Sequence, residues 1–409
     1  MPDLRRPSWV RSRRDPPPAE LIYLIAPAGH PNLGDEFIAR TWLRYLAAHR
    51  PRAHVVLDCH TPGQASILLG QVHPNVQYVD TVWRMIAGLE TTPVSDAADI
   101  VMAAVAEPGR MPLLLDGIEL FARADSIHLV GGGYVNSLWP HHLSLIAAAV
   151  QVRRRNGASV FLTGQGLLPA GDSDHLALLR SLLDEVSVID VRDRDSADLL
   201  AGSRLRPRLD VTGDDAWLGV LGDGVYDTTS SVVARRFMIC VQTHLMGADA
   251  GVVVDEGRDA VIDDLEAQIE GLVQRWGMTG ENTAFVEAMP GDDGLLFRRF
   301  ADRMPGLELI PFTGVWRNGF PATADQVWIT TRFHAHLLAA ARGASGVIIT
   351  GRSDYYPIKH RSLLEQGSRW RIIDSVGDAP QEDGGFPAPV VAELAAGKRA
   401  LAAALYPRR

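Results

Sequence analysis

Lysine is nearly absent from this chain. Only two of its 409 residues are lysine, and arginine makes up the rest of the 40 basic residues. One of the two, Lys359, follows a Tyr-Tyr-Pro turn in the most polar part of the C-terminal half. Because a planar guanidinium does not replace a compact, mobile ammonium, the lysine at this position predicts a role in binding or chemistry.

Cysteine and long apolar runs are also scarce. Cys59 and Cys240 lie far apart, so they predict neither a disulfide framework nor a metal site, and they favour a reducing cytoplasm. No apolar run reaches the roughly 18 residues that a membrane-spanning helix needs. With 46% hydrophobic and 22% charged residues, the sequence is typical of a soluble globular protein.

Basic stripes are missing as well. The formal net charge is −9, which argues against a nucleic-acid partner. Residues 1–20 are the exception, because five arginines there precede three consecutive prolines, and no apolar core follows that would make a signal peptide. Their composition predicts a disordered arm, and the alternative is weak peripheral contact with anionic lipid at the inner face of the membrane.

Strand patterns alternate with helix patterns along the rest of the chain. In the first half, strands are expected at 21–26, 53–57, 76–79, 127–130, 159–163 and 186–191, and helices at 35–49, 143–155 and 173–184. In the second half, strands are expected at 237–242, 283–287, 307–310, 326–329, 346–350 and 370–374, and helices at 261–276, 293–303, 333–342, 358–366 and 388–405. Such alternation predicts an α/β fold with parallel sheets.

The pattern divides the chain into two α/β domains of similar size. We expect them at 21–217 and 235–375, joined by a linker at 218–234 that is rich in Gly, Asp, Ser and Thr. Residues 376–409 are expected to supply a C-terminal helix that packs back on the N-terminal lobe. Because ligands of open α/β sheets bind beyond the C-terminal ends of the strands, the site is expected in a cleft between the lobes.

Polar or glycine-rich loops follow several strands of the first half. After the first strand, Gly34 permits close backbone approach and Asp35 is a candidate helix cap. The triplet Gly131, Gly132 and Gly133 follows another strand, and its backbone N–H groups are expected to face an anion or a sugar.

Three further loops in this half each allow two interpretations. Gln165 is suited either to bind a sugar hydroxyl or to brace its own loop. The alternating charges of residues 192–196 also fit a solvated helix start. In the Asp214-Asp215 pair, one carboxylate is a candidate general base and the other a cap.

The second half carries a cationic group at a helix start. Arg332 and His334 flank Phe333 there, and the helix dipole favours a bound anion. His336 falls on the opposite side of the helix and is expected to be structural. Arg, His and Lys converging on one site would suit a small, doubly charged anion.

Taken in order, these segments resemble the polysaccharide pyruvyl transferase family. The matching segments are Asn32-Leu33-Gly34-Asp35-Glu36, Gly131-Gly132-Gly133, Gly164-Gln165-Gly166, Arg192-Asp193-Arg194-Asp195-Ser196, Gly213-Asp214-Asp215-Ala216, Arg332-Phe333-His334-Ala335 and Tyr356-Pro357-Ile358-Lys359. The resemblance spans residues 22–366.

The resemblance implies a GT-B-like arrangement of two Rossmann-like lobes with an interlobe cleft. It implies transfer of the enolpyruvyl carbons of phosphoenolpyruvate to two hydroxyls of a saccharide, free or lipid-linked, as a cyclic ketal, without a cofactor. The family's Arg, His and Lys correspond to Arg192, His334 and Lys359, and Asp35 is the expected acceptor of the hydroxyl proton. The expected substrate-binding residues are Asn32, Gly34, Gly131, Gly132, Gly133, Gln165, Asp214, Asp215, Arg332, Tyr356 and His244.

Two features depart from the family pattern. The stretch 343–359 is longer than usual, and Gln242-Thr243-His244 stands where many members have an arginine. The alternative functions are a GT-B-type nucleotide-sugar glycosyltransferase and a non-catalytic glycan-binding member of the fold.

Overall fold

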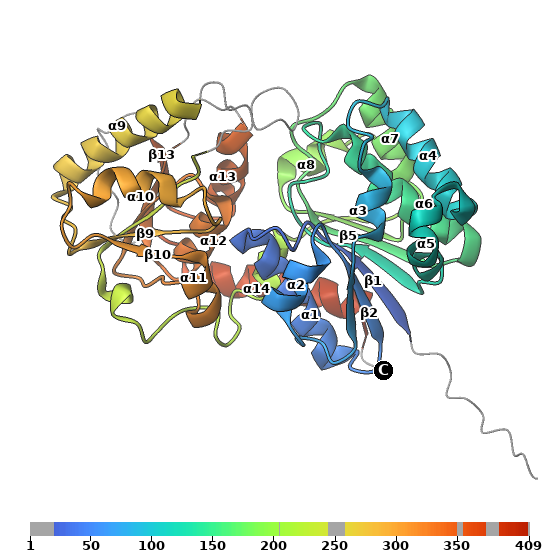
Figure 1. The fold of residues 1–409 in the computed structure, drawn as a ribbon, viewed down its shortest axis with the longest axis horizontal. Helices are drawn as coiled ribbons and strands as arrows, with labels where there is room; N and C mark the ends of the chain where they lie inside the picture. Colours follow the sequence, from blue (N-terminus) through green and yellow to red (C-terminus); the bar gives the residue numbers. More distant parts are fainter. Residues whose placement is uncertain (1–19, 204, 244–257, 350–354, 374–383, 408–409) are drawn as a thin grey trace, which may run out of the picture.

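The chain folds into two lobes, each built on a parallel β-sheet with helices on both faces (Figure 1). A computed structural model describes residues 20–203, 205–243, 258–349, 355–373 and 384–407. The expected N-terminal arm therefore lies outside the described residues except for Glu20. Within the described part of the chain, no helix combines the length and apolar character needed to cross a bilayer.

The first lobe holds a seven-stranded sheet in the order β3-β2-β1-β4-β5-β6-β7. Its strands are β1 (Leu21–Ile25), β2 (His54–Asp58), β3 (Val76–Val79), β4 (Ser126–Leu129), β5 (Ser159–Gln165), β6 (Val188–Val191) and β7 (Leu209–Val211). All neighbours are parallel, with Ile22 of β1 opposite Val55 of β2 and Ser126 of β4. The short strand β7 has no counterpart among the strands expected from the sequence, because three residues are too few to establish an alternating pattern.

Helices cover both faces of this sheet. They are α1 (Leu33–His49), α2 (Pro62–Leu69), α3 (Thr81–Ile86), α4 (Val94–Ala106), α5 (Leu115–Phe121), α6 (Leu143–Asn156), α7 (Ser173–Leu183) and α8 (Arg194–Leu199). Side chains alternate along β1, so Ile22 and Leu24 pack with α1, whereas Tyr23 and Ile25 pack with α4 and α6.

The second lobe repeats the design with a six-stranded parallel sheet in the order β10-β9-β8-β11-β12-β13. Its strands are β8 (Phe237–Cys240), β9 (Thr283–Val286), β10 (Glu308–Ile310), β11 (Val327–Thr330), β12 (Ser345–Ile349) and β13 (Arg371–Ile373). Its helices are α9 (Arg258–Trp276), α10 (Gly294–Ala301), α11 (Phe312–Asn318), α12 (Phe333–Ala341) and α13 (Tyr355–Glu365).

Both sheets reverse their strand order next to their first strand. The reversal lies between β1 and β4 in the first lobe and between β8 and β11 in the second. Parallel strands that feed helices in opposite directions leave a crevice at this point, and α/β proteins bind their ligands there. The loops after these four strands are thus the places where a site is expected.

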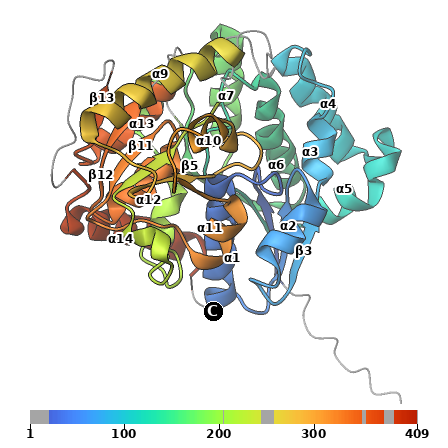
Figure 2. The ribbon, with the colours of Figure 1, turned by 60° about the vertical axis from the view of Figure 1, so that its left-hand side comes forward.

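The lobes share one apolar core. A single cluster includes Leu24 of the first sheet and both Met238 and Trp328 of the second. At its edge, Trp316 of α11 donates from Nε1 to the carbonyl of Leu68 at 2.9 Å, and Figure 2 shows α11 beside α1 and α2. This continuity fixes how the two crevices face each other.

The last helix, α14 (Ala388–Leu405), runs along the junction of the two lobes (Figure 1). Before it starts, Phe386 N donates to the carbonyl of Ala340 at the end of α12 at 2.8 Å. Beyond it, the Tyr406 ring packs edge-on against Trp42 of α1. The segment 218–234 contacts the second lobe through a bridge between Tyr226 and Phe320.

Candidate active site

A cavity of about 370 Å³ lies between the two crevices. Its polar lining from the first lobe comprises Asn32, Asp35, His60, His142 and Arg192, and from the second lobe Gln242, Thr331, Arg332, His334 and Lys359. The cavity therefore gathers the expected catalytic residues Asp35, Arg192, His334 and Lys359 from four separate loops or helices.

Helix α1 begins at the wall of this cavity. The structure corrects one expectation, because the helix starts at Leu33 and its N-cap is Asn32, not Asp35. The Asn32 side chain accepts weakly from Gly34 N at 3.4 Å and donates from Nδ2 to Asp35 Oδ2 at 2.8 Å. Asp35 is thus freed from capping and lies in the first helical turn, next to the cavity.

Gly34 allows the two lobes to come into contact at the site. A methyl group on its α-carbon would overlap the imidazole of His334. Nearby, Leu33 N donates to the carbonyl of Ala288 in the second lobe at 2.9 Å. The backbone of Gly34 lies in an ordinary helical turn that any residue could adopt. Glycine is therefore required here for close approach of the lobes and not for its backbone conformation.

His334 stands in the first turn of α12, facing the first lobe. Its Nε2 lies 3.5 Å from Asp214 Oδ1, longer than a well-formed hydrogen bond. Burial acts to raise the pKa of Asp214, but the contact with His334 and the charge of Arg192 outweigh it and hold the pKa below its ordinary value. Asp214 is therefore a carboxylate facing the imidazole.

Arg192 follows β6 and is almost fully buried. Its Nε lies 3.1 Å from Asp193 Oδ2, and its guanidinium stacks over the Phe333 ring at 5.0 Å from the centroid. Gly166 makes room for it, because a side chain at that position would overlap the guanidinium. Gln366 of the second lobe donates to the Arg192 carbonyl at 3.0 Å. These contacts hold the arginine at the cavity wall.

Lys359 reaches the cavity from α13. Burial lowers its pKa well below the ordinary value, and the neighbouring charge of Arg192 acts in the same direction, against Asp35 and Asp214. For Asp35, burial raises the pKa to about 6, although the charges of His334 and Lys359 oppose the rise. A cationic cavity wall and a carboxylate with a raised pKa are typical of sites that handle anions and move protons.

Arg332 is already paired. Its Nη2 lies 3.0 Å from Asp292 Oδ2 and its Nε 3.1 Å from Asp293 Oδ1. Asp293 also accepts from Ala288 N at 2.8 Å, so the arginine holds the loop before α10. Arg332 was expected to bind substrate; it borders the cavity, but two carboxylates compensate its charge.

Two expectations for the glycine triplet are wrong. Gly131 N donates to Asp215 Oδ2 at 2.7 Å and Gly132 N to the Gly164 carbonyl at 3.3 Å. Their N–H groups donate hydrogen bonds within the first lobe and do not face a ligand. Of the triplet, only Gly133 lines the cavity.

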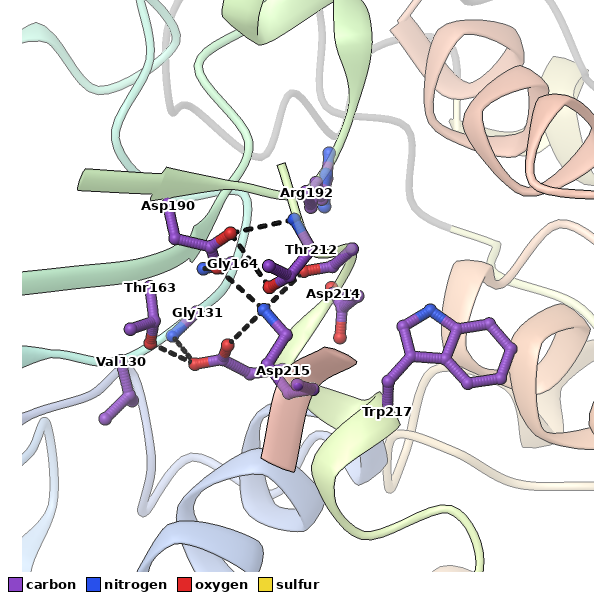
Figure 3. A network of polar contacts seen from close by, with 12 residues as sticks. Val130, Gly131, Thr163, Gly164, Asp190, Arg192, Thr212, Asp214, Asp215 and Trp217 are labelled. Carbon is purple, nitrogen blue, oxygen red and sulfur yellow. Dashed lines mark hydrogen bonds and ion pairs between the residues drawn. The ribbon is translucent and has the colours of Figure 1, made fainter. Parts of the chain in front are cut away.

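Gln165 and Asp215 are internal braces. Gln165 is fully buried and donates from Nε2 to the carbonyls of Leu129, Val130 and Thr163 at 3.0–3.1 Å. This geometry favours the loop-bracing interpretation over sugar binding. Asp215 is also fully buried and accepts from Gly131 and Thr163 (Figure 3), which leaves it unsuited to take a proton from a substrate.

His336 is structural, as expected. Its Nδ1 lies 3.0 Å from His360 Nδ1, its Nε2 2.7 Å from the Ser368 hydroxyl, and its ring stacks on Trp370. His360 Nε2 must donate to the Thr331 carbonyl, so the neutral His360 ring accepts at Nδ1. Burial lowers the pKa of both rings, to about 4 for His360. The pair fastens α13, and hence Lys359, to α12.

Two expected residues cannot be placed. His244 and the side chain of Tyr356 lie outside the described residues. Sequence reasoning in turn missed several cavity residues, namely His60, Tyr134, Trp139 and His142. A Trp-Pro-His-His run shortly after the glycine triplet was the available signal for two of them.

Solved structures confirm the architecture. UDP-GlcNAc 2-epimerase of Methanocaldococcus jannaschii, in complex with UDP-GlcNAc and UDP, is 11% identical with a TM-score of 0.52, covering 95% of this chain and 99% of that one. S. aureus MnaA, bound to UDP, is 11% identical with a TM-score of 0.50, covering 94% and 88%. Similarity at this level shows the fold alone, a GT-B-like arrangement of two Rossmann-like lobes.

Sequence comparison identifies the family. No protein with a curated description matches the chain. The family model of polysaccharide pyruvyl transferases matches residues 32–236, about half of the 409 residues. This stretch contains the α1 start, the glycine loops, Arg192 and Asp214. The chain belongs to the polysaccharide pyruvyl transferase family.

Proposed function

We propose that this protein moves the enolpyruvyl carbons of phosphoenolpyruvate onto two hydroxyls of a saccharide, forming a cyclic ketal and releasing phosphate. The observation that carries the proposal is the convergence of Arg192, Lys359 and His334 on one cavity between the lobes. A donor with a phosphate and a carboxylate needs several cations. Family membership supports the transfer class.

The donor is held by the cations of both lobes. Arg192 supplies planar, bidentate donors from the first lobe, and Lys359 supplies a compact ammonium from the second. Together they bind the phosphate and carboxylate groups and stabilise the charge on the departing phosphate. Because the two residues come from different lobes, donor binding also ties the lobes together.

His334 delivers the proton that starts the reaction. It protonates the CH₂ carbon of the enol, and the neighbouring carbon becomes an oxocarbenium-like centre. The first sugar hydroxyl adds to this centre, the C–O bond to phosphate breaks, and the second hydroxyl closes the ring. The two hydroxyl protons balance the proton gained by carbon and the one carried off by phosphate. Asp214, 3.5 Å from the imidazole, orients it.

Asp35 is the best-placed base. Asp215 is enclosed by internal hydrogen bonds and Asp214 faces His334, whereas Asp35 lines both the main cavity and an adjoining hollow. The hollow also includes His30 and His60. We assign it to the approaching saccharide, free or lipid-linked, whose hydroxyl then meets Asp35 beside the donor. No cofactor enters the reaction, and we place it in the cytoplasm.

Donor identity is tested first by binding. Phosphoenolpyruvate should bind in calorimetry and raise the melting temperature, and UDP should do neither. Stabilisation by UDP with none by phosphoenolpyruvate would favour a nucleotide-sugar glycosyltransferase instead. Binding of glycans alone, without either donor, would favour a non-catalytic role.

Chemistry is then tested by phosphate release in the presence of candidate glycans, with the mass gain of one ketal on the product. His334→Gln should abolish both signals while the protein stays folded. His54→Gln is the matched control, because this histidine makes only an exposed contact with Gln77. Undiminished release in His334→Gln would remove His334 from the mechanism.

A further inference from the structure

The second lysine of the chain is buried beneath the candidate site. Lys398 lies on α14 and is fully inaccessible to solvent. Its Nζ lies 2.7 Å from Asp190 Oδ2 and 3.0 Å from Asp215 Oδ1, and it donates to the Gly213 carbonyl at 2.6 Å. Burial acts to lower the pKa of Lys398, but the two carboxylates outweigh it and hold the pKa above its ordinary value.

Each carboxylate in turn holds loops of the first lobe (Figure 3). Asp215 Oδ2 accepts from Gly131 N at 2.7 Å and from the Thr163 hydroxyl at 2.6 Å. Trp42 of α1 donates to the same oxygen at 2.7 Å. One carboxylate thereby connects the glycine triplet, the end of β5 and the helix that carries Asp35.

Asp190 also holds the end of β5, and it adds one further loop. Its Oδ2 accepts from Gly164 N at 2.8 Å, and its Oδ1 accepts from both N and Oγ1 of Thr212 at 2.8 Å. The loop from Thr212 runs directly into Asp214, the carboxylate that faces His334. The ammonium of Lys398 is therefore the common centre of the contacts that hold the glycine triplet, the end of β5 and the loop that carries Asp214.

The helix that brings this ammonium is anchored to both lobes. Phe386, two residues before its start, bonds to the end of α12, the helix whose first turn carries His334. Lys398 then reaches the loop that carries Asp214. One helix thus links the element bearing the imidazole to the loop bearing its carboxylate partner.

The arrangement suits lysine rather than arginine. Three acceptors surround a single nitrogen at 2.6–3.0 Å, which matches the three N–H donors of an ammonium. A guanidinium spreads its donors over a wide plane and would need more room than a fully buried site gives. In a chain with only two lysines, both line or support the same site.

We propose that Lys398 is a positioning residue, which couples docking of the C-terminal helix to the placement of Asp214 and the glycine loops, and so sets the contact between Asp214 and His334. The effect on turnover rests on the proposed function, whereas the effect on the loops does not. The loop that Lys398 holds through Gly213 carries Asp214, the carboxylate that faces His334, whereas Arg192 is held by Asp193 and Phe333. Loss of Lys398 therefore disturbs proton transfer more than donor binding.

The main test compares Lys398→Met with the double variant Lys398→Met/Asp190→Asn. The single change leaves two buried carboxylates facing each other, which is expected to destabilise the fold. The double variant keeps the wild-type net charge of this cluster, one negative charge, and should recover much of the stability. Leu401→Ala, at a buried apolar residue of the same helix, is the control that lowers stability by removing apolar packing while keeping the ammonium and its contacts.

Two readouts separate positioning from stability. Hydrogen exchange at the amide of Gly131, which donates to the unchanged Asp215, should be at least about tenfold faster in both lysine variants, but not in Leu401→Ala. In the phosphate-release assay, kcat should fall about 10- to 100-fold in the double variant with KM for phosphoenolpyruvate changed less than about threefold.

Other outcomes overturn the proposal. A double variant with wild-type kcat and wild-type exchange would mean that Lys398 only balances charge, and failure of both lysine variants to fold would assign it to folding. An equal kcat loss in Leu401→Ala would attribute the effect to stability. If the wild type releases no phosphate from phosphoenolpyruvate, the proposed function fails, and the exchange rates alone decide whether Lys398 positions the loops.

Discussion

The imidazole of His334 lies so close to the α-carbon of Gly34 that a methyl group there would overlap the ring. The two residues belong to different lobes and are 300 positions apart in the sequence. Both residues line the cavity beside Asp35, and Asp214 faces the same imidazole. Four predictions start from this relationship and the contacts around it.

Gly34→Ala should displace the imidazole and leave the fold intact. An alanine fits the helical backbone, so the clash falls on His334 alone, and phosphate release should drop about 100-fold as expected for a misplaced catalytic group. Gly63→Ala is the matched control, because this helical glycine has open space around its α-carbon. Wild-type turnover in Gly34→Ala would show that the ring can move without consequence.

Turnover should decline in acid because Asp35 must be ionised to accept a hydroxyl proton. The pKa of Asp35 is raised to about 6, so kcat/KM should be full well above pH 6 and be lost as the pH falls through this value. Asp35→Asn should lower kcat by about 10² to 10⁴-fold and leave donor affinity nearly unchanged. If the residual activity of Asp35→Asn still declines in acid as the wild type does, the decline belongs to another group.

The protein should take up protons when phosphoenolpyruvate binds. The pKa of Lys359 is lowered well below its ordinary value in the free protein, and a bound dianion beside the amine should raise it again. The complex therefore holds more protons than the free protein, and affinity should fall as the pH rises. Calorimetry at pH 8 in two buffers of different ionisation enthalpy measures the uptake, which should vanish in Lys359→Met.

Arg332→Met should destabilise the second lobe. The change leaves Asp292 and Asp293 buried without their cation, and breaking a buried pair in this way costs about 3 to 5 kcal/mol. Urea unfolding should show the loss in the free energy of unfolding. Arg206→Met is the control, since its pair with Asp184 is on the surface and should have almost no effect. An equally stable Arg332→Met would show that the two carboxylates find other partners.

Much of the architecture follows from local pattern. The alternation of apolar strands with amphipathic helices was sufficient to predict the paired α/β lobes, because a strand such as Leu21–Ile25 is apolar at every position and must be buried on both faces. Prediction was least successful at short elements such as β7 and at the start of α1, where Asn32 and Asp35 are both plausible caps by composition.

The sequence predicted which loops form the candidate site better than it predicted which of their residues face the cavity. The ends of parallel strands meet at one edge, so polar residues that follow them come together, as Arg192, His334 and Lys359 do. Whether a given polar group faces the cavity depends on its partners, and Gly131, Gln165 and Asp215 look alike in sequence to residues that bind ligands. Each instead bonds to groups inside the first lobe.

The two α/β lobes, the family and the order of the polar loops could all be predicted from the residues alone, because these features depend on periodicity and motifs within short stretches. Three features became visible only in the folded molecule: Asn32 rather than Asp35 caps α1, Gly34 leaves room for His334, and Lys398 joins Asp190 to Asp215. These contacts link residues up to 300 positions apart. Their geometry depends on how two sheets and a final helix pack together, which no local pattern encodes.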